Sequence, residues 1–249
     1  DNYLSGSKAN HVNGVTYVNG CVSDIKNIFT SETFDNIFHF GEYSRVEKSR
    51  EQPRLALKNG YQSFPALLEY AMDINAKVTY SASSTKFASR GSSLSPYTFF
   101  KASNSDLIQR YGEWYGLNYV TVYFYNCYGS NEISQGDYAT LIGKYKHMKK
   151  NGATKLPVSR PGTQTRNFTH IEDTVAGIVL ATKSGNGDGY GIGSDEAYSV
   201  LDVCEMFGCQ PDFYDANAAN RAGAPVNNQK IKALGWQAKH RLPQYIARL

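Results

Sequence analysis

The sequence predicts an α/β fold, in which a doubly wound parallel sheet is joined by a smaller, interleaved C-terminal region. Short runs rich in β-branched and aromatic residues alternate with longer runs of helical periodicity through about residue 127. Each predicted strand ends in small, polar or glycine residues, which is typical of sheets that bind ligands at the carboxyl ends of their strands. From about residue 128 the alternation weakens and turn-rich segments increase, so a second region is expected there.

Each element of the first region has its own signal. The run "PRLALKNGYQSFPALLEYAMD" has apolar residues at helical spacing, whereas "AKVTYSAS" and "NYVTVYFYN" have strand composition. The predicted elements are, in order, strand 14–20, helix 24–29, strand 34–41, helix 53–73, strand 76–83, helix 95–116 and strand 118–126.

The second region is predicted to cross back to the first. Residues 169–185 form an amphipathic helical pattern, and the tail from residue 199 reads as short helices and loops. The glycine-rich run 184–195 resembles a phosphate-binding loop, but no register in it gives G-x-G-x-x-G, so we expect a surface turn that leads into a strand. We therefore predict two domains: residues 1–127 with 168–184, and residues 128–167 with 185–249.

Composition excludes several classes of function. The 26 basic and 22 acidic residues give a net charge of +4 and are scattered, which argues against a nucleic-acid partner. We expect no membrane segment and no signal peptide, because no apolar run is long enough. The four cysteines have neither metal-site spacing nor a secreted disulfide pattern, which favours a cytoplasmic protein with reduced thiols.

The strongest chemical signal is in "SPYTFFKASNSD". Tyr97 and Lys101 are four residues apart on a predicted helix and therefore share a face. A neighbouring ammonium stabilises a phenolate, which makes a tyrosine useful as a general acid and base. Ser83 ends the preceding strand, so its hydroxyl can reach the same space. The alternative is an ordinary amphipathic helix with one exposed lysine.

An ordered series of motifs covers nearly the whole chain. It comprises "DNYLSG", "VSDI", "IFHFGEYSRVEKS", "YSASSTKF" with "SPYTFFKASNSD", "YFYNCYGSN", "PGTQTRNFTHIEDTVAGI" and "LGW". Each piece alone is weak, but the series resembles the nucleotide-sugar epimerases and dehydratases of the extended short-chain dehydrogenase/reductase family, typified by UDP-galactose 4-epimerase. The resemblance implies a Rossmann-like sheet and NAD as cofactor.

The resemblance also implies a role for each matching residue. Tyr97 is the acid/base, Lys101 tunes it and binds the nicotinamide ribose, and Ser83 assists. A carboxylate at Asp1 favours NAD over NADP, because it would repel a 2′-phosphate. The residues expected to contact NAD are Asp1, Asn2, Asp24, Ile25, Phe40, Gly41, Asn59, Tyr97, Lys101 and Phe124. Those expected to contact a nucleotide-diphosphate sugar are Ser83, Ser84, Asn126, Arg166 and Arg221.

These residues have plainer interpretations as well. On strand pattern alone, Phe40 and Phe124 belong to the core, and Asn126 caps a turn. The two arginines would be surface charges. His39 and His170 are interpreted as structural histidines, and no metal site is expected because no partner spacing supports one.

Three departures from the family pattern stand out. The glycine-rich loop that binds the pyrophosphate is missing, and we expect the first strand and helix of the domain to be missing with it. Glu42 follows Gly41 where the family usually has a small pair, so a carboxylate beside the cofactor groove is unexpected. Ser84 and Thr85 stand where 4,6-dehydratases carry an Asp–Glu pair.

The predicted activity is NAD-dependent epimerisation of a nucleotide-diphosphate sugar, at C4 through a 4-keto intermediate. A 4,6-dehydratase or keto-sugar reductase on the same scaffold remains an alternative, as does a nucleotide-binding relative without activity. The resemblance also implies a homodimer formed through a four-helix bundle, with the helices near residues 54–73 and 95–116 as candidates.

Overall fold

The computed structural model describes residues 1–83, 95–215 and 225–249. Ser84 and Arg221, both expected to contact substrate, lie outside the described residues. The chain divides into two compact units: residues 1–122 with 182–189, and residues 123–181 with 190–249. This division places most of the segment 168–184 in the second unit, whereas the sequence-based division places it in the first.

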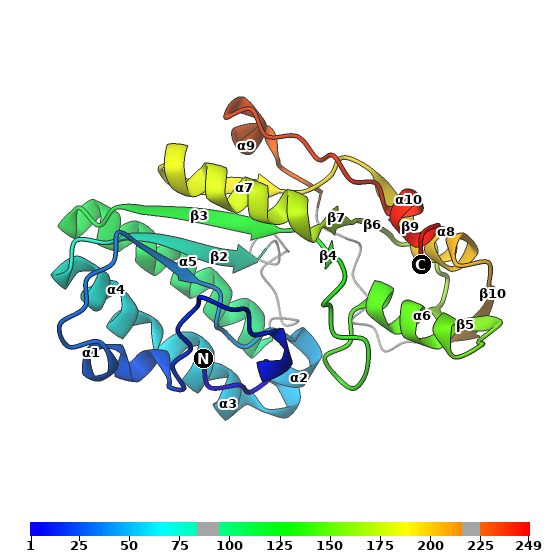
Figure 1. The fold of residues 1–249 in the computed structure, drawn as a ribbon, viewed down its shortest axis with the longest axis horizontal. Coiled ribbons are helices and arrows are strands. Elements are labelled where there is room, and N and C mark those ends of the chain that lie inside the picture. The colour runs from blue at the N-terminus through cyan, green and yellow to red at the C-terminus, as the bar shows by residue number, and fades with distance from the viewer. Residues whose placement is uncertain (84–94, 216–224) are drawn as a thin grey trace. The chain divides into compact units, whose positions relative to one another are not determined.

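The first unit is built on a sheet with strand order β1-β2-β3-β8. Figure 1 shows its strands β2 and β3 side by side. Strands β1 (Asn36–His39) and β2 (Lys77–Ser83) are parallel, and His39 pairs with Tyr80 at the carboxyl end of β1. The order departs from the chain order where β8 follows β3, so the connection is a crossover, as in doubly wound sheets. The predicted α/β class is confirmed.

The helices that precede and follow β2 pack against that strand. The elements of the first unit are η1 (Lys8–Asn10), η2 (Val22–Asp24), α1 (Ile25–Ile28), β1, α2 (Val46–Glu51), α3 (Pro53–Leu57), η3 (Lys58–Gln62), α4 (Phe64–Asp73), β2, α5 (Pro96–Tyr115), β3 (Tyr119–Phe124) and β8 (Gly187–Ile192), the last two continuing into the second unit. Helices α4 and α5 contact β2 and each other. Phe64 and Phe100 are fully buried there, and the ring centroids of Phe64 and Tyr80 are 4.7 Å apart.

Two sequence predictions for the first unit are wrong. Residues 14–20 form no strand: Val15 and Tyr17 are exposed, and Tyr17 instead stacks on the ring of His11, with centroids 3.6 Å apart. The predicted helix 53–73 is divided into α3, the π-helical η3 and α4. A β-carbon at Gly60, within η3, would lie 2.6 Å from the ring of Phe100, so the close approach of α5 requires glycine at that point.

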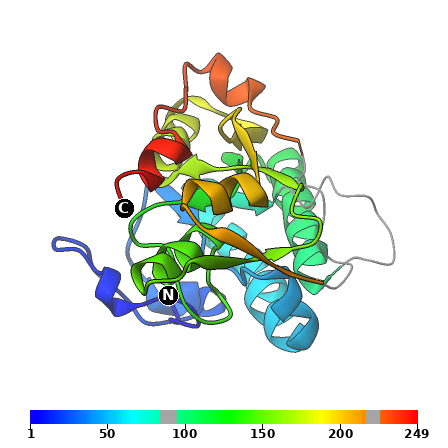
Figure 2. The same cartoon turned by 90° about the vertical axis from the view of Figure 1, so that its right-hand side faces the viewer.

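The second unit has its own core around a two-stranded parallel sheet. Its elements are β4 (Cys127–Tyr128), α6 (Leu141–Lys150), β5 (Lys155–Ser159), β6 (Thr165–Asn167), β7 (Thr169–His170), α7 (Ile171–Ser184), β9 (Ala197–Ser199), α8 (Val200–Met206), β10 (Gln210–Tyr214), α9 (Gln229–Ala233) and α10 (Leu242–Ile246). Helix α8, gold in Figure 2, contacts both β5 and β10. Its Val203 packs with Tyr145 of α6 and Leu242 of α10 in one buried cluster.

None of the helices in residues 1–83, 95–215 and 225–249 is both long and apolar enough to cross a membrane.

Candidate active site

Tyr97 and Lys101 lie on the first turns of α5, where the sequence fixes the start of the helix. Ser95 is the N-cap, since its Oγ accepts a hydrogen bond of 3.1 Å from the backbone N–H of Thr98, and Pro96 occupies the first turn. Tyr97 is half-buried, and its backbone N–H donates to the Oγ of Ser49 over 3.2 Å. The predicted spacing of the two residues over one helical turn is therefore present in the structure.

The side chain of Lys101 points into the protein. It is 7% exposed, and its Nζ donates to the backbone carbonyl of Ser81 on β2 over 2.6 Å. The same Nζ lies 2.5 Å from Oε2 of Glu42 and 5.2 Å from the ring centroid of Tyr80. Lys101 thus connects α5 to β2, two residues before Ser83 at the end of that strand.

Glu42 lies at the centre of a buried polar cluster. Its Oε2 accepts a hydrogen bond from the hydroxyl of Tyr80 over 3.2 Å, and its Oε1 accepts one from Nδ2 of Asn104 over 2.8 Å. Nε2 of His39 lies 3.2 Å from the same Oε1. Burial by itself would raise the pKa of Glu42, but the charge of Lys101 and the hydrogen bond from His39 outweigh it and lower the pKa below its usual value.

This cluster is the part of the site that sequence reasoning missed. Glu42 stood out only as a departure from the family pattern, and His39 was interpreted as structural. The signal that could have found the cluster is the combination of a buried-strand histidine, a glutamate three residues later and a helix carrying lysine and asparagine at i and i+3. None of these residue types is favoured in a core without a partner.

The residues expected to bind NAD in the first unit are largely exposed. Nδ2 of Asn2 lies 3.5 Å from Oδ1 of Asn59, so two of them are neighbours. Oδ1 of Asp1 accepts a hydrogen bond from the backbone N–H of Tyr3. Asp24 is exposed and Ile25 is half-buried at the start of α1. Their side chains remain accessible to a ligand.

Phe40 and Gly41 follow β1 and are also open to solvent. Phe40 is 41% exposed, so it is not the core residue that strand pattern alone suggested. A β-carbon at Gly41 would meet nothing within 4 Å. A flat ring system can therefore approach the backbone at this point.

Three predicted residues lie in the second unit. Phe124 is half-buried at the end of β3. Asn126 is exposed with φ of 37°, and its Nδ2 donates to the backbone carbonyl of Asn167 over 2.9 Å. Arg166 comes directly before Asn167 on β6, and burial lowers the pKa of its guanidinium. Asn126 thus fixes the backbone beside Arg166.

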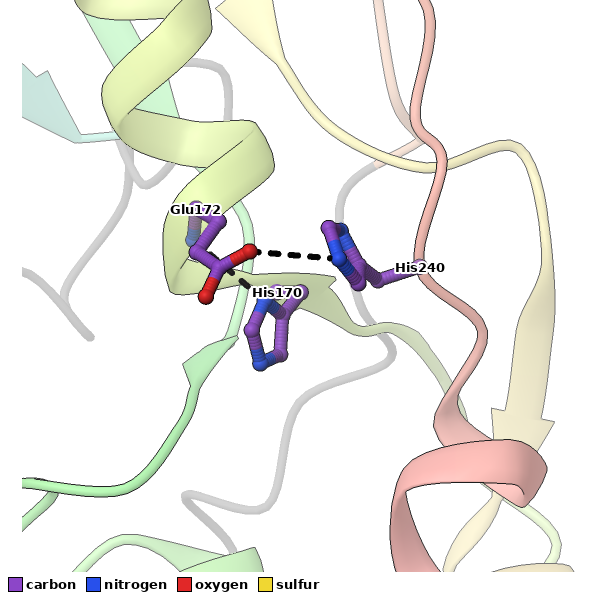
Figure 3. A group of neighbouring side chains, drawn as sticks. All are labelled: His170, Glu172 and His240. Carbon is purple, nitrogen blue, oxygen red and sulfur yellow. Dashed lines mark hydrogen bonds and ion pairs between the residues drawn. The ribbon is translucent and has the colours of Figure 1, made fainter.

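His170, Glu172 and His240 form a second polar group, shown in Figure 3. Nδ1 of His170 accepts a hydrogen bond from the backbone N–H of Glu172, and Nε2 of His240 lies 3.2 Å from Oε2 of Glu172. Nδ1 of His240 lies 3.0 Å from Oδ1 of Asp173. The centroids of the two histidine rings are 4.5 Å apart and the rings are tilted by 31°, and the possible ligand atoms of His170, Glu172 and His240 lie within 4.8 Å of one another. Glu172 thus contacts His240 at the start of α7. That this protein has no metal site stays a prediction.

Comparison with known protein families identifies the family of this chain. Residues 2–193 match the model of the NAD dependent epimerase/dehydratase family. The chain belongs to this family. The resemblance to this family that the motifs predict is thereby confirmed, and so is the predicted NAD dependence.

Similar proteins in the epimerase/dehydratase family include both kinds of enzyme. A trifunctional UDP-glucose 4,6-dehydratase/UDP-4-keto-6-deoxy-D-glucose 3,5-epimerase/UDP-4-keto-L-rhamnose-reductase of Arabidopsis thaliana is 26% identical over 236 residues, which cover 85% of this chain and 35% of that protein. The UDP-glucose 4-epimerase of Lactobacillus helveticus is 24% identical over 253 residues, which cover 87% of this chain and 76% of that protein. The chain thus spans about a third of the length of the first of these relatives.

Solved structures agree on the fold. The UDP-glucose 4-epimerase of Thermotoga maritima, solved with UDP-glucose, has a TM-score of 0.90 at 20% identity, covering 99% of this chain and 86% of that one. The Thermus thermophilus UDP-glucose 4-epimerase, in complex with NAD, has a TM-score of 0.85 at 21% identity, covering 99% and 87%. The predicted Rossmann-like fold is therefore confirmed.

The first unit also allows a test of whether the residues present fit NAD. The open backbone at Gly41, the exposed ring of Phe40 and the neighbouring amides of Asn2 and Asn59 provide apolar surface and hydrogen-bonding groups for a dinucleotide. Lys101 differs from these exposed residues, because it is buried and its ammonium already has an anionic partner in Glu42. The residues fit the cofactor, with an additional carboxylate next to the lysine.

Proposed function

We propose that this protein is an NAD-dependent epimerase that acts at C4 of a nucleotide-diphosphate sugar. The observation that carries the proposal is the position of Tyr97 one helical turn before Lys101, with Lys101 bound to β2 two residues before Ser83. The attachment of this helix to this strand supports a site made of a phenol, an ammonium and a hydroxyl.

In the proposed reaction Tyr97 accepts the proton of the sugar hydroxyl and later returns it. Ser83 donates a hydrogen bond to the same sugar oxygen, and the ammonium of Lys101 stabilises the phenolate. NAD, when bound, supplies hydride acceptance and return at the sugar carbon. Because the proton taken by Tyr97 goes back to the 4-keto intermediate, one residue serves as base and acid, and the cycle has no net redox change.

The cofactor and substrate would be bound by different sets of residues. Asp1, Asn2, Asp24, Ile25, Phe40, Gly41, Asn59 and Phe124 would hold NAD. Arg166 and Arg221 would bind the diphosphate of the substrate, since a guanidinium donates two parallel hydrogen bonds to phosphate oxygens. Asn126 supports this role by binding the carbonyl of Asn167, next to Arg166. Anchoring by the diphosphate leaves the sugar free to present its other face.

The alternative reaction on the same scaffold is 4,6-dehydration, the activity printed first in the name of the Arabidopsis relative. Elimination of water from C5 and C6 requires its own acid and base. Ser84 and Thr85 occupy the positions where the family's dehydratases carry an acidic pair. A hydroxyl at ordinary pKa is a poor base, which favours epimerisation.

The experiment is an NMR assay in D₂O with NAD and a panel of UDP-, dTDP- and GDP-hexoses. Epimerisation predicts the C4 epimer with no deuterium in its carbon-bound positions, because hydride returns to the carbon that it left. Dehydration predicts a 4-keto-6-deoxy sugar with deuterium at C5. A keto-sugar product that accumulates together with NADH would indicate a reductase running in reverse. Bound NAD without any product would indicate a relative that binds nucleotides without turnover.

We also propose that the protein is a homodimer formed by α4 and α5. Large apolar side chains on and beside these helices are exposed, with Trp114 at 61% and Tyr115 at 59% on α5, and Met72 on α4. Exposed large apolar side chains on two helices support this proposal, because a second copy could cover them. Light scattering should give twice the mass of one chain, and Trp114→Glu should give a monomer. A monomeric unmodified protein at micromolar concentration would contradict this proposal.

A further inference from the structure

The carboxylate of Glu42 is a buried titratable group that the proposed reaction does not use. It lies in the loop between β1 and α2, and its side chain is 1% exposed. The titratable groups that face it are Lys101 from α5, His39 from β1 and Tyr80 from β2. Burial of an unpaired carboxylate is strongly unfavourable, so this position requires the donors that surround it.

The ammonium of Lys101 depends on that carboxylate in turn. Its other hydrogen-bond acceptor in the described residues is the neutral carbonyl of Ser81, and its remaining neighbour is the ring of Tyr80. A buried ammonium with no counter-ion loses its proton more readily than an exposed one. The charge of Lys101 is therefore maintained by Glu42.

Tyr97 lies one helical turn before Lys101 on α5, so the two side chains share a face of that helix. Tyr97 also packs edge-on against Phe100, at 5.4 Å between ring centroids, on the turn that leads to Lys101. A change in the charge of Lys101 would therefore reach the phenol.

We propose that Glu42 is a positioning residue for the active site: its carboxylate fixes Lys101 against β2 and keeps it as an ammonium. The inference rests on the proposed function, because that function gives Lys101 its role beside Tyr97. Without Glu42 the lysine loses its proton at a lower pH, and a neutral amine stabilises a phenolate far less than an ammonium does. Glu42 thereby determines the pH range in which Tyr97 can act as a base.

The test measures the protonation of Lys101 directly, in the full chain and without turnover. Reductive methylation with formaldehyde and borohydride consumes only neutral amines, and mass spectrometry of the peptide that contains Lys101 gives the modified fraction at each pH. In Glu42→Gln we expect methylation of Lys101 to begin at least about one pH unit lower than in the unmodified protein, which is about a tenfold faster reaction at a fixed pH. Glu42→Asp, which keeps the charge, should remain close to the unmodified protein.

Two controls isolate the effect of charge. The exposed Lys183 in the same digest should react equally in every variant. Tyr80→Phe removes one hydrogen bond to Glu42 but no charge, and it should leave the methylation of Lys101 unchanged. Methylation of Lys101 that is the same in Glu42→Gln and in the unmodified protein would overturn the inference.

The pH dependence of kcat provides the second readout. In Glu42→Gln the ascending limb should move to higher pH, whereas a purely structural defect would lower kcat at every pH alike. A limb that moves to lower pH would mean that Lys101 stays charged without Glu42 and would also overturn the inference. If no sugar nucleotide is converted even by the unmodified protein, the proposed function fails, and the methylation result still decides the role of Glu42.

A double variant covers the case in which Glu42→Gln does not fold. Glu42→Gln combined with Lys101→Met removes both charges and keeps the volume, so it should fold if the damage comes from the unpaired ammonium. Lys101→Met alone is the reference, because it also lacks the hydrogen bond to Ser81. A double variant that is more damaged than Lys101→Met would show that Glu42 acts independently of Lys101, contrary to the proposal.

Discussion

The indole Nε1 of Trp236 donates a hydrogen bond of 2.9 Å to the backbone carbonyl of Asp173. The buried carboxylate of Asp173 continues this connection, since Oδ2 accepts the backbone N–H groups of Lys239 and His240 over 3.0 and 2.9 Å. One residue at the start of α7 thus fixes the segment 236–240, which has little regular secondary structure of its own.

We expect Asp173→Ala to lower the free energy of unfolding by about 2–4 kcal/mol, because the donors of segment 236–240 would lose a charged acceptor in a buried site. Urea denaturation followed by circular dichroism measures this change. Asp212→Ala, at an exposed aspartate of the same unit, should change the free energy by less than about 0.5 kcal/mol. Equal effects of the two substitutions would contradict this account of Asp173.

Replacing Tyr97 by Phe should lower kcat by about 10²–10⁴-fold, because the proposed general acid and base is lost while the ring and its packing on Phe100 remain. NAD binding, followed by fluorescence or calorimetry, should be nearly unchanged. Tyr115→Phe on the same helix is the matched control, since that side chain is 59% exposed and outside the proposed site. Normal turnover by the Tyr97 variant would disprove the mechanism.

The stability conferred by Glu42 should depend on pH in a defined direction. Its folded-state pKa is lowered, so its contribution is complete above the unfolded value of about 4.3 and is lost as the pH falls toward the folded value. Glu42→Gln should therefore destabilise by about 3–5 kcal/mol at about pH 7. Thermal melts of both proteins across a pH series should show this difference shrink below about pH 4. A difference that grows on acidification would mean that the sign of the shift is wrong.

Gly60→Ala should destabilise the first unit by about 1–3 kcal/mol, because the added methyl group would lie 2.6 Å from the ring of Phe100. It would also disturb the carbonyl of Gly60, which accepts a hydrogen bond of 2.7 Å from Nδ2 of Asn104. Gly41→Ala is the matched control for stability, since its β-carbon meets nothing within 4 Å. Chemical denaturation should separate the two variants by more than 1 kcal/mol (estimated from the cost of overpacking).

Much of the fold follows from local pattern. The helix predicted at 95–116 is α5 at Pro96–Tyr115, because a serine cap, a proline at the first turn and Gly116 with φ of 73° define both ends. The strand predicted at 14–20 fails, because apolar residues make a strand only where a partner strand covers them, and Val15 remains exposed. The break in helix 53–73 depends on the close approach of Phe100 from α5. The periodicity of apolar residues within 53–73 gives no information about that tertiary contact.

The candidate site was likewise predictable only where its residues lie on one element. Tyr97 and Lys101 share one helix, so their relation could be derived from spacing. Glu42 and Lys101 meet only through the packing of α5 on β2, and nothing in the local sequence of either residue specifies the other. The same holds for His170 and His240, whose contact joins β7 to the C-terminal segment.

The hydrogen bond from Lys101 to the carbonyl of Ser81 affects how any experiment on this lysine must be interpreted. Substitution of Lys101 would remove a chemical group and, in the same step, detach α5 from the strand that carries Ser83. Loss of turnover in such a variant would therefore be a mixture of two effects that kinetics alone cannot separate. Substituting the acid that faces Lys101 separates them, because the lysine stays in the protein to be observed.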